Sequence, residues 1–453
     1  MNKDSVFKTI SLFALPMLIG NILQQMYNIV DTWIVGRYIS SDALAAVGSV
    51  FSLMVFISSI LLGLCMGSGV VFSYAFAQKE YEVLERRLGT SFSCIGIVMV
   101  VITAVSLILT NQILHWIHIP ENLFHMTREY LVIIIFGIPA VFLYNFFAAY
   151  LKSVGNSVLP LLWLAISTVC NVVLDLYFII GLQMGIKGAA YATIIAQYVS
   201  GIGCVMSCLV RDRHIRAMWK KITIQIEDVK ILVRYSLYTC IQQSVMNLGI
   251  LMVQGIVNTF GASVMAAFAT GVKIDAFAYM PAQEYGNAAS IFLAQNYASG
   301  DNKRVREGIG ISILTSGIYC LSASAVIWIF AEDLMRIFVD ASNTEIIQTG
   351  VEYLHIEGAF YIGIGFLFLL YGFCRALGNP EMSLVLTILS LGTRVVLAKI
   401  SASGALGKIT LGRWLGLTGS GAVRGIWMAV PVGWFLADVV GFLWMQHKKY
   451  QIK

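Results

Sequence analysis

Two acidic residues lie inside long apolar runs of the sequence, where a charged side chain is rare and usually functional. Asp31 falls in the run 10–36 and Asp175 in the run 158–181. A carboxylate in hydrocarbon costs several kcal/mol, so each acid is expected to face a cavity or a polar partner. These two residues are therefore the first candidates for chemistry in this chain.

Neutral polar side chains are expected beside the two acids, all within about two helical turns of the same membrane depth. They are Gln24, Tyr27, Asn171 and Thr193. Such oxygens suit a hard monovalent cation, and we expect a Na+ site at Asp31, Asn171, Asp175 and Thr193. The same set suits a proton, because two close carboxylates do not both stay ionised cheaply. The alternative is that each acid only accepts hydrogen bonds from neighbouring helices. No other metal and no other cofactor is expected.

The composition requires a solvent that tolerates apolar surface. Of 453 residues, 58% are hydrophobic and only 12% are charged, with a mean hydropathy of +0.80. Soluble domains average about 25% charged residues. The chain is therefore a polytopic membrane protein, and a soluble enzyme is not expected.

Other features of composition narrow the class of protein. The net charge of +6 comes from bases scattered between apolar runs, so nucleic acid is not an expected partner. The eight cysteines show no CxxC spacing, so neither a disulfide framework nor a zinc site is indicated. The first residues, MNKDSVFKTI, lack the apolar core of a signal peptide, and no cleavage is expected.

Twelve apolar runs are long enough to span a bilayer, which needs about 20 residues per helix. The fold class is therefore all-α, with twelve transmembrane helices. The runs are 10–36, 44–76, 90–111, 128–150, 158–181, 187–210, 231–258, 264–298, 307–330, 346–374, 382–400 and 423–446.

Basic residues gather in the segments that lie inside if both termini are cytoplasmic, as the positive-inside rule requires. We therefore expect a multi-pass protein of the inner or plasma membrane with both termini in the cytoplasm. The inner bases include Lys3, Lys8, Lys79, Arg86, Arg87, Lys152, the group from Arg211 to Arg234, Lys303, Arg304, Arg306 and Arg375.

The two halves of the chain are related in sequence. YLKSVGNSVLPL at 150–161 matches FCRALGNPEMSL at 373–384, and NVVLD at 171–175 lies over RVVLA at 394–398. The repeat predicts two pseudo-symmetric six-helix lobes, residues 1–210 and 231–453, joined by a polar cytoplasmic linker at 211–230. Transporters are commonly built this way.

The repeat also predicts a difference between the lobes. Arg394 stands where the first half has Asn171, and Ala398 stands where it has Asp175. A cation site of the expected kind can therefore exist only in the first lobe.

Polar residues deep in other spans are candidates to line a substrate cleft. Lys273 and Asp275 lie two apart and so point to different faces of one helix. The full candidate set is Asn145, Lys273, Asp275, Gln283 and Glu284. Lys273 could equally be a structural cation paired with a neighbouring acid. Arg394 and Asp438 lie on adjacent expected helices and predict an ion pair within the second lobe.

Several prolines fall inside expected spans, where each removes a backbone hydrogen bond and permits a kink. They are Pro16, Pro139, Pro281 and Pro431. Bending at Pro16 would move Asp31 relative to Asp175.

The sequence resembles the multidrug and toxic compound extrusion (MATE) family over nearly its whole length, most closely the DinF-like branch. The resemblance is carried by LPMLIGNILQQMYNIVDTWIVGRY at 15–38, Asn171 with Asp175, KGAAYAT at 187–193 and MPAQEYGNAAS at 280–290. It implies a cation motif in the first lobe at Asp31, Asn171, Asp175 and Thr193, flanked by Gln24 and Tyr27. A long glycine-rich segment, SASGALGKITLGRWLGLTGSGAVRG at 401–425, departs from the family pattern.

The resemblance implies a secondary antiporter that exports amphipathic, often cationic, drugs or metabolites in exchange for Na+ or H+ by alternating access. Small molecules of this kind and membrane lipids are the expected partners, and the chain is expected to work as a monomer. A lipid or oligosaccharide flippase of a related two-lobed fold is an alternative, and a membrane-embedded enzyme is a further one. The sequence contains no HExxH, GxSxG or GxxxxGK[ST] motif, so an enzyme is not expected and the energy must come from an ion gradient.

Overall fold

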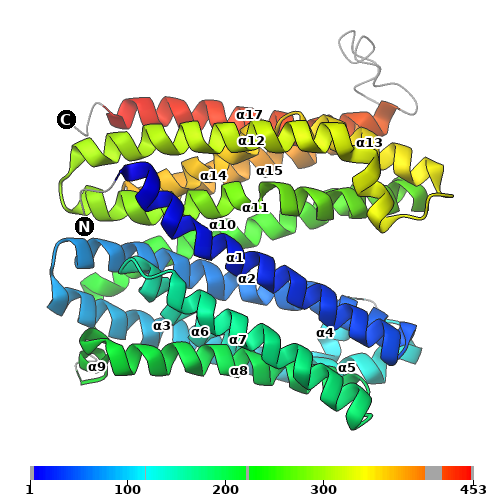
Figure 1. Ribbon diagram of the computed structural model, residues 1–453, viewed down its shortest axis with the longest axis horizontal. Helices are drawn as coiled ribbons and strands as arrows, with labels where there is room; N and C mark the ends of the chain where they lie inside the picture. The colour runs from blue at the N-terminus through cyan, green and yellow to red at the C-terminus, as the bar shows by residue number, and fades with distance from the viewer. Residues whose placement is uncertain (1–4, 118, 221–223, 404–420, 450–453) are drawn as a thin grey trace. The chain divides into compact units, whose positions relative to one another are not determined.

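The computed structural model describes residues 5–117, 119–220, 224–403 and 421–449, and every regular element in these ranges is helical (Figure 1). In the first half the helices are α1 (Val6–Tyr38), α2 (Ser41–Ala77), α3 (Tyr81–Ile108), α4 (Thr110–Trp116), α5 (Glu121–Ile135), α6 (Ile138–Ser153), α7 (Val158–Asp175), the π-helical turn η1 (Leu176–Gly181), α8 (Ile186–Arg211) and α9 (Arg213–Lys220). The second half holds α10 (Ile226–Val257), the short 3₁₀ turn η2 (Asn258–Phe260), α11 (Ala262–Ala298), α12 (Asn302–Phe338), α13 (Thr344–Gly358), α14 (Tyr361–Ala376), α15 (Pro380–Ala402) and α17 (Gly421–Lys449).

The twelve predicted membrane spans are confirmed. Ten helical segments are long and apolar enough to cross a bilayer, and α13 with α14 forms an eleventh span bent by 53°. The remaining predicted run, 264–298, falls on α11, a helix of 37 residues in which Lys273, Asp275 and Glu284 interrupt the apolar sequence and which is not among the spans assigned by length and composition. The glycine-rich segment predicted between the last two spans falls largely at 404–420, outside the described residues.

The fourth span of each half is a broken helix. In the first half α5 ends at Ile135 and α6 begins at Ile138, and in the second half the break falls between Gly358 and Tyr361. The predicted interruption at Pro139 is observed, because the span breaks at 136–137 and this proline lies in the first turn of α6. Proline is tolerated there since the first amides of a helix have no intrahelical acceptor.

The turns between helices repeat the sequence match of the two halves. Gly155, between α6 and α7, has φ of +90°, and Gly378, between α14 and α15, has φ of +85°. The α2–α3 turn has Lys79 at φ of +59°, and the α11–α12 turn has Gly300 at +77°. Because positive φ is rare outside glycine, the same turn geometry at matched positions is strong evidence for the predicted pseudo-symmetry.

The described chain separates into two compact units. One comprises residues 15–243 and the other residues 1–14 with 244–453. The boundaries thus fall inside α1 and α10, not at the ends of a linker as in the predicted division into 1–210, 211–230 and 231–453. The lobe limits deduced from the sequence stay a prediction.

Much of the expected linker is docked on the first unit. The ring Nδ1 of His214, on α9, is hydrogen-bonded to Oε1 of Glu85 on α3 at 3.0 Å. The same ring stacks on Tyr81, with the ring centroids 4.7 Å apart. The hydroxyl of Tyr150 donates to Asp212, just before α9. These contacts explain why α9 belongs to the compact unit and is not an extended tether.

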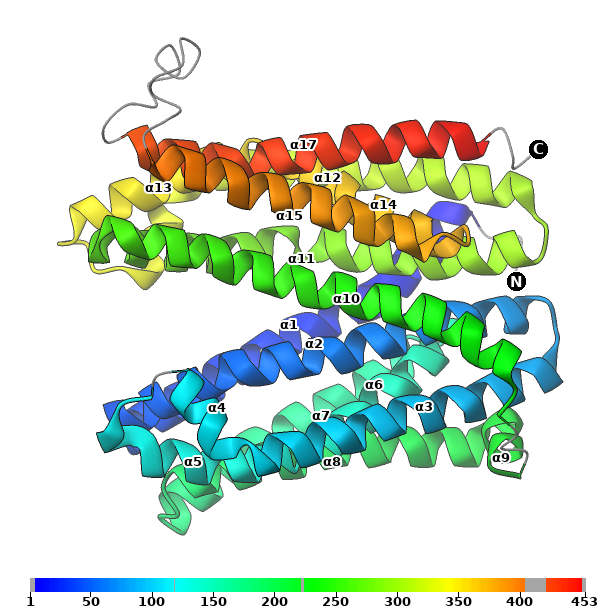
Figure 2. The same ribbon diagram turned by 180° about the vertical axis from the view of Figure 1, so that it is seen from behind.

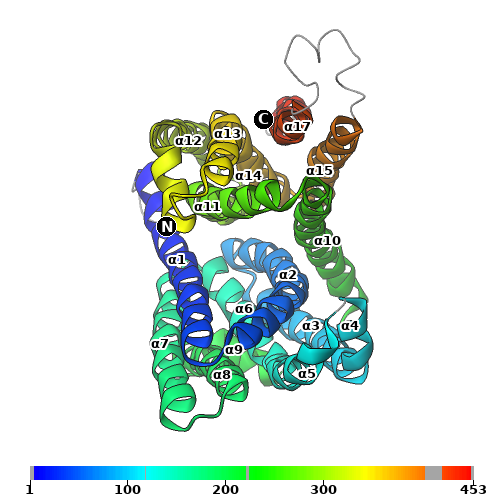
Figure 3. The same cartoon turned by 90° about the vertical axis from the view of Figure 1, so that its right-hand side faces the viewer.

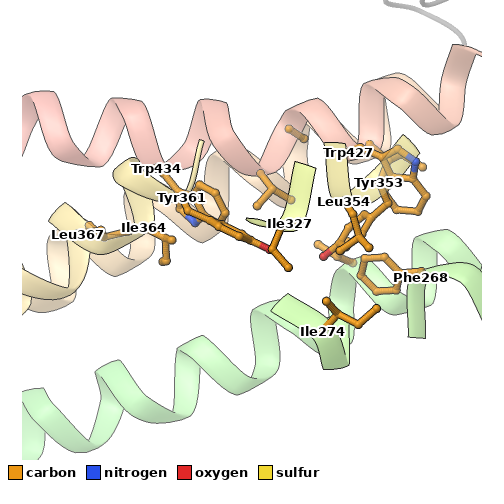
Figure 4. Close-up of a cluster of buried hydrophobic side chains, with 14 of the residues drawn as sticks. Phe268, Ile274, Ile327, Tyr353, Leu354, Tyr361, Ile364, Leu367, Trp427 and Trp434 are labelled. Carbon is orange, nitrogen blue, oxygen red and sulfur yellow. The ribbon is translucent and has the colours of Figure 1, made fainter. Parts of the chain in front are cut away.

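Within the first unit, α2 packs against α3, α5 and α6, and α7 packs against α8 (Figures 2 and 3). Within the second unit, α15 runs alongside α17, and α11 packs against α12, α13 and α14. The second unit has an aromatic core in which Phe268 and Trp427 stack at 5.4 Å and Tyr353 meets Trp427 edge-on at 5.0 Å (Figure 4).

Two glycines one helical turn apart let α2 lie directly against the backbone of α10. A Cβ at Gly63 would lie 2.5 Å from the Cα of Cys240, and one at Gly67 would lie 2.5 Å from the Cα of Ser236. Small residues with this spacing permit close approach of membrane helices. Beside them the hydroxyls of Ser68 and Ser236 are hydrogen-bonded at 2.8 Å. This packing fixes the first half of α10 to the first unit.

We expect Gly67→Ala to destabilise the protein by about 1–3 kcal/mol, because the added methyl group collides with backbone that has no room to move. Thermal unfolding in detergent should show a clear fall in Tm. The control is Gly96→Ala on α3, whose Cβ would meet nothing within 4 Å. An equal effect of the two substitutions would contradict close α2–α10 packing.

Candidate functional site

The two acids singled out in the first half are buried in the first unit. Asp31 lies on α1 and is 7% exposed, and Asp175 is the last residue of α7 and is fully buried. Asn171, one turn earlier on α7, is also fully buried, and Thr193 on α8 is 7% exposed. Four polar side chains from three helices are thus removed from solvent.

The structure brings these side chains together. The carboxyl groups of Asp31 and Asp175 are close enough to share a hydrogen bond when one of them carries a proton. Asn171 adjoins Asp175, and the hydroxyl of Tyr27 adjoins Thr193. Gln24 is exposed on α1, and nothing in the described structure joins it to the group.

Most polar atoms of this group have no hydrogen-bond partner among the described residues. They are Oδ1 of Asp31, Oδ1 and Nδ2 of Asn171, both carboxyl oxygens of Asp175 and Oγ1 of Thr193. A buried polar atom without a partner costs about 1–3 kcal/mol, and more if it is charged. Two ionised carboxylates offer each other only acceptors, so a proton or a cation is needed to bridge them.

The donor set fits a small hard cation. Carboxylate, amide and hydroxyl oxygens are the ligands preferred by ions that bind through oxygen, and no sulfur or imidazole is present in the group. One proton shared by the two acids would also remove the repulsion between them. The arrangement can therefore take up one positive charge, as Na+ or as H+.

Helix packing explains how these residues meet. Ser167 on α7 donates a hydrogen bond of 2.7 Å to the carbonyl of Ala196 on α8, which holds the two helices in contact one turn from Asn171 and Thr193. Directly after Asp175 the chain continues as the π-helical turn η1. Such turns occur frequently at functional sites because they change the helical register locally.

Two residues of this region were missed by the sequence reasoning. Tyr130 on α5 is buried and lies close enough to Asp31 and Asp175 to interact with their charges. Gln197 lies one turn after Thr193 on α8, and its Oε1 has no partner among the described residues. Gln197 could have been found from the sequence, because it is four residues after Thr193 and so lies on the same face of one helix. Tyr130 could not, because its place beside the acids depends on where α5 begins.

The second unit contains a buried acidic group of its own. Asp275 on α11 accepts hydrogen bonds from the hydroxyls of Tyr353, at 2.6 Å, and Tyr361. Glu357 on α13 adjoins Asp275, and the guanidinium of Arg394 on α15 lies 3.9 Å from the Glu357 carboxylate. In this group the positive charge is supplied by the protein itself.

The predicted ion pair between Arg394 and Asp438 was wrong. Arg394 pairs with Glu357, and Oδ1 of Asp438 on α17 has no partner among the described residues. The prediction assumed only that the two helices are neighbours, and this does not determine which of their faces meet. Glu357 reaches Arg394 because it lies at the bend between α13 and α14.

The five candidate cleft residues lie on two helices, α6 in the first unit and α11 in the second. Asn145 is on α6 in the first unit, where its amide donates to the carbonyl of Val141 at 2.8 Å. On α11, Lys273 is exposed, whereas Asp275 is buried on another face. Gln283 is half-buried, and Glu284 accepts a hydrogen bond of 3.1 Å from Asn287. A common role in a substrate cleft stays a prediction.

Comparison with known proteins agrees with this architecture. The MatE family model matches residues 16–177 and 236–400. The probable multidrug resistance protein YoeA of Bacillus subtilis (strain 168) is 29% identical over 356 residues, which cover 76% of each chain. The probable multidrug resistance protein NorM of Thermotoga maritima is 24% identical over 415 residues, covering 89% of this chain and 87% of the relative.

Solved structures share the fold. A MOP superfamily transporter from Pyrococcus furiosus superposes with a TM-score of 0.90 at 22% identity, covering 99% of this chain and 97% of that one. The family match spans well over half of the sequence and includes both halves of the repeat. The chain belongs to the MatE family, whose members are multidrug efflux transporters and not enzymes.

Proposed function

We propose that this protein is a secondary antiporter that exports amphipathic, often cationic, drugs or metabolites in exchange for Na+ or H+ by alternating access. The observation that carries the proposal is the contact between the buried carboxyl groups of Asp31 and Asp175, with unpaired oxygens from Asn171 and Thr193 beside them. The names of the multidrug resistance relatives support the substrate class.

The coupling follows from the charge of this pair. When both acids are ionised they repel each other, and uptake of one cation or proton draws them and their helices together. Pro16 leaves an unbonded carbonyl in α1, so α1 can bend between Asp31 and its N-terminal end. Substrate binding is coupled to the ion if the bent and straight states differ in affinity for each.

The repeat explains why only one half would carry the coupling ion. Arg394 occupies the position equivalent to Asn171, and Tyr353 is equivalent to Tyr130 by the same offset. The second unit thus has two acids and a tethered guanidinium, where the first has two acids and needs a charge from solution. We infer that Arg394 acts as a fixed substitute for the ion and that its group stays constant through the cycle.

The placement in the cell follows from the distribution of bases in the sequence. We propose that the protein lies in the inner or plasma membrane with both termini in the cytoplasm and acts as a monomer on substrates that reach it through lipid. Nucleic acid is not a partner in this account.

Asp31→Asn should reduce ion-driven export by about tenfold or more, because an amide cannot change its charge with the ion. Asp175→Asn should act in the same way. The measurement is efflux from proteoliposomes with the Na+ gradient and the pH gradient imposed separately, which also distinguishes the two ions. Tm in detergent checks that the variants remain folded.

The matched control is Asp42→Asn, which removes an exposed acid from the first turn of α2. It should leave export unchanged. Full ion-driven export by Asp31→Asn and Asp175→Asn would contradict the assignment of the coupling site.

Arg394→Gln should lower stability by about 3–5 kcal/mol, since it leaves buried acids without their counter-charge. The expected readout is a large fall in Tm that is partly reversed at low pH, where a proton neutralises one acid. Ion coupling in the remaining folded protein should persist. Lys399→Gln, an exposed base on the same helix, is the control and should be neutral. Loss of coupling at unchanged Tm would refute the structural role of Arg394.

A further inference from the structure

The second unit contains a cavity between α14 and α17, away from the acidic group around Asp275. Its volume is about 440 Å³. It lies at the bend between α13 and α14, where Phe360 occupies the break and the chain turns by 53°. Cavities of this size accommodate drug-sized molecules.

The cavity has a single charged group. Asp438 on α17 lines it, is 7% exposed, and has Oδ1 without a partner among the described residues. None of the lining residues is Lys, Arg or His. A buried carboxylate with no counter-charge is expensive, so the site favours a ligand that brings a positive charge.

The walls are aromatic and aliphatic. Phe366 on α14 and Phe442 on α17 meet edge-on with ring centroids 5.7 Å apart, and Phe435 closes another side. Aromatic faces attract cations, more strongly where water is excluded. The lining therefore suits an apolar body that carries a cationic centre.

The cavity is reached from the apolar surface of α17. Phe435 is 65% exposed, and Leu443 and Val439 are also exposed, all within a membrane span. Gly363 also lines the cavity, and a Cβ there would lie 3.3 Å from the Cβ of Trp434 and 3.6 Å from a carboxyl oxygen of Asp438. Entry from the hydrocarbon favours compounds that already partition into lipid. Asp438 lies more than two turns inside the end of α17, too deep for the amine of a lipid headgroup.

We propose that this cavity is a binding site for hydrophobic organic cations drawn from the bilayer, with the cationic centre at Asp438 and the apolar body against Phe366, Phe435 and Phe442. The site shares no residue with the Asp31–Asp175 group. The two proposals can therefore fail separately.

The test uses a photoreactive alkylammonium probe on the purified protein in lipid nanodiscs, with cross-linked positions mapped by mass spectrometry. We expect labelling of α14 and α17 around the cavity and competition by tetraphenylphosphonium. Asp438→Asn should weaken labelling at these positions by about tenfold or more, because charged hydrogen bonds contribute about 1.5–3 kcal/mol. A neutral alcohol probe of the same length should label them weakly.

A second pair of variants covers the case in which Asp438→Asn does not fold. Val439→Trp fills the cavity from its exposed side and should abolish labelling, whereas Val440→Trp, exposed on the same helix but outside the cavity lining, should not. Asp31→Asn should retain labelling at α14 and α17. Equal labelling by the neutral probe, or no loss in both Asp438→Asn and Val439→Trp, would overturn the proposal.

Discussion

The structure depends on one electrostatic constraint, the burial of two carboxyl groups in contact at Asp31 and Asp175. Two negative charges in this environment would repel each other, so a cation or a proton at this pair would stabilise the first unit. Under the proposed coupling, the three helices that supply the group, α1, α7 and α8, are the elements whose packing should respond most to ion concentration and pH. This sensitivity is what an ion-coupled transporter requires.

The second unit also buries two acids, but there the protein itself supplies the positive charge. Asp275 accepts hydrogen bonds from tyrosine hydroxyls, and Glu357 pairs with the guanidinium of Arg394, a side chain of the protein itself. In the proposed mechanism, the pseudo-symmetric fold contains one acidic group that exchanges its counter-charge and one that keeps it. Asp438 is a buried acid of the second unit that belongs to neither group, and its apolar surroundings support the proposed separate site.

Much of this was predictable because membrane burial leaves strong signals. Each predicted apolar run falls on a described helix or broken helix, and the matched segments 150–161 and 373–384 contain the equivalent turns at Gly155 and Gly378. Depth in the membrane placed Asp31 and Asp175 in one layer, and the structure puts them in contact. Depth says nothing about helix rotation or neighbours, however. For that reason Tyr130 was missed and Arg394 was assigned to Asp438, where the true partner depends on the bend after α13.

The most direct test of the central claim is the charge state of the acid pair itself. Difference infrared spectroscopy of the purified protein can follow the carboxylic acid band as pH or Na+ concentration is changed. The account predicts a band that decreases when Na+ is added or pH is raised and that is absent from Asp31→Asn and Asp175→Asn. A carboxyl signal that responds to neither ion, or that is the same in wild type and both variants, would contradict it.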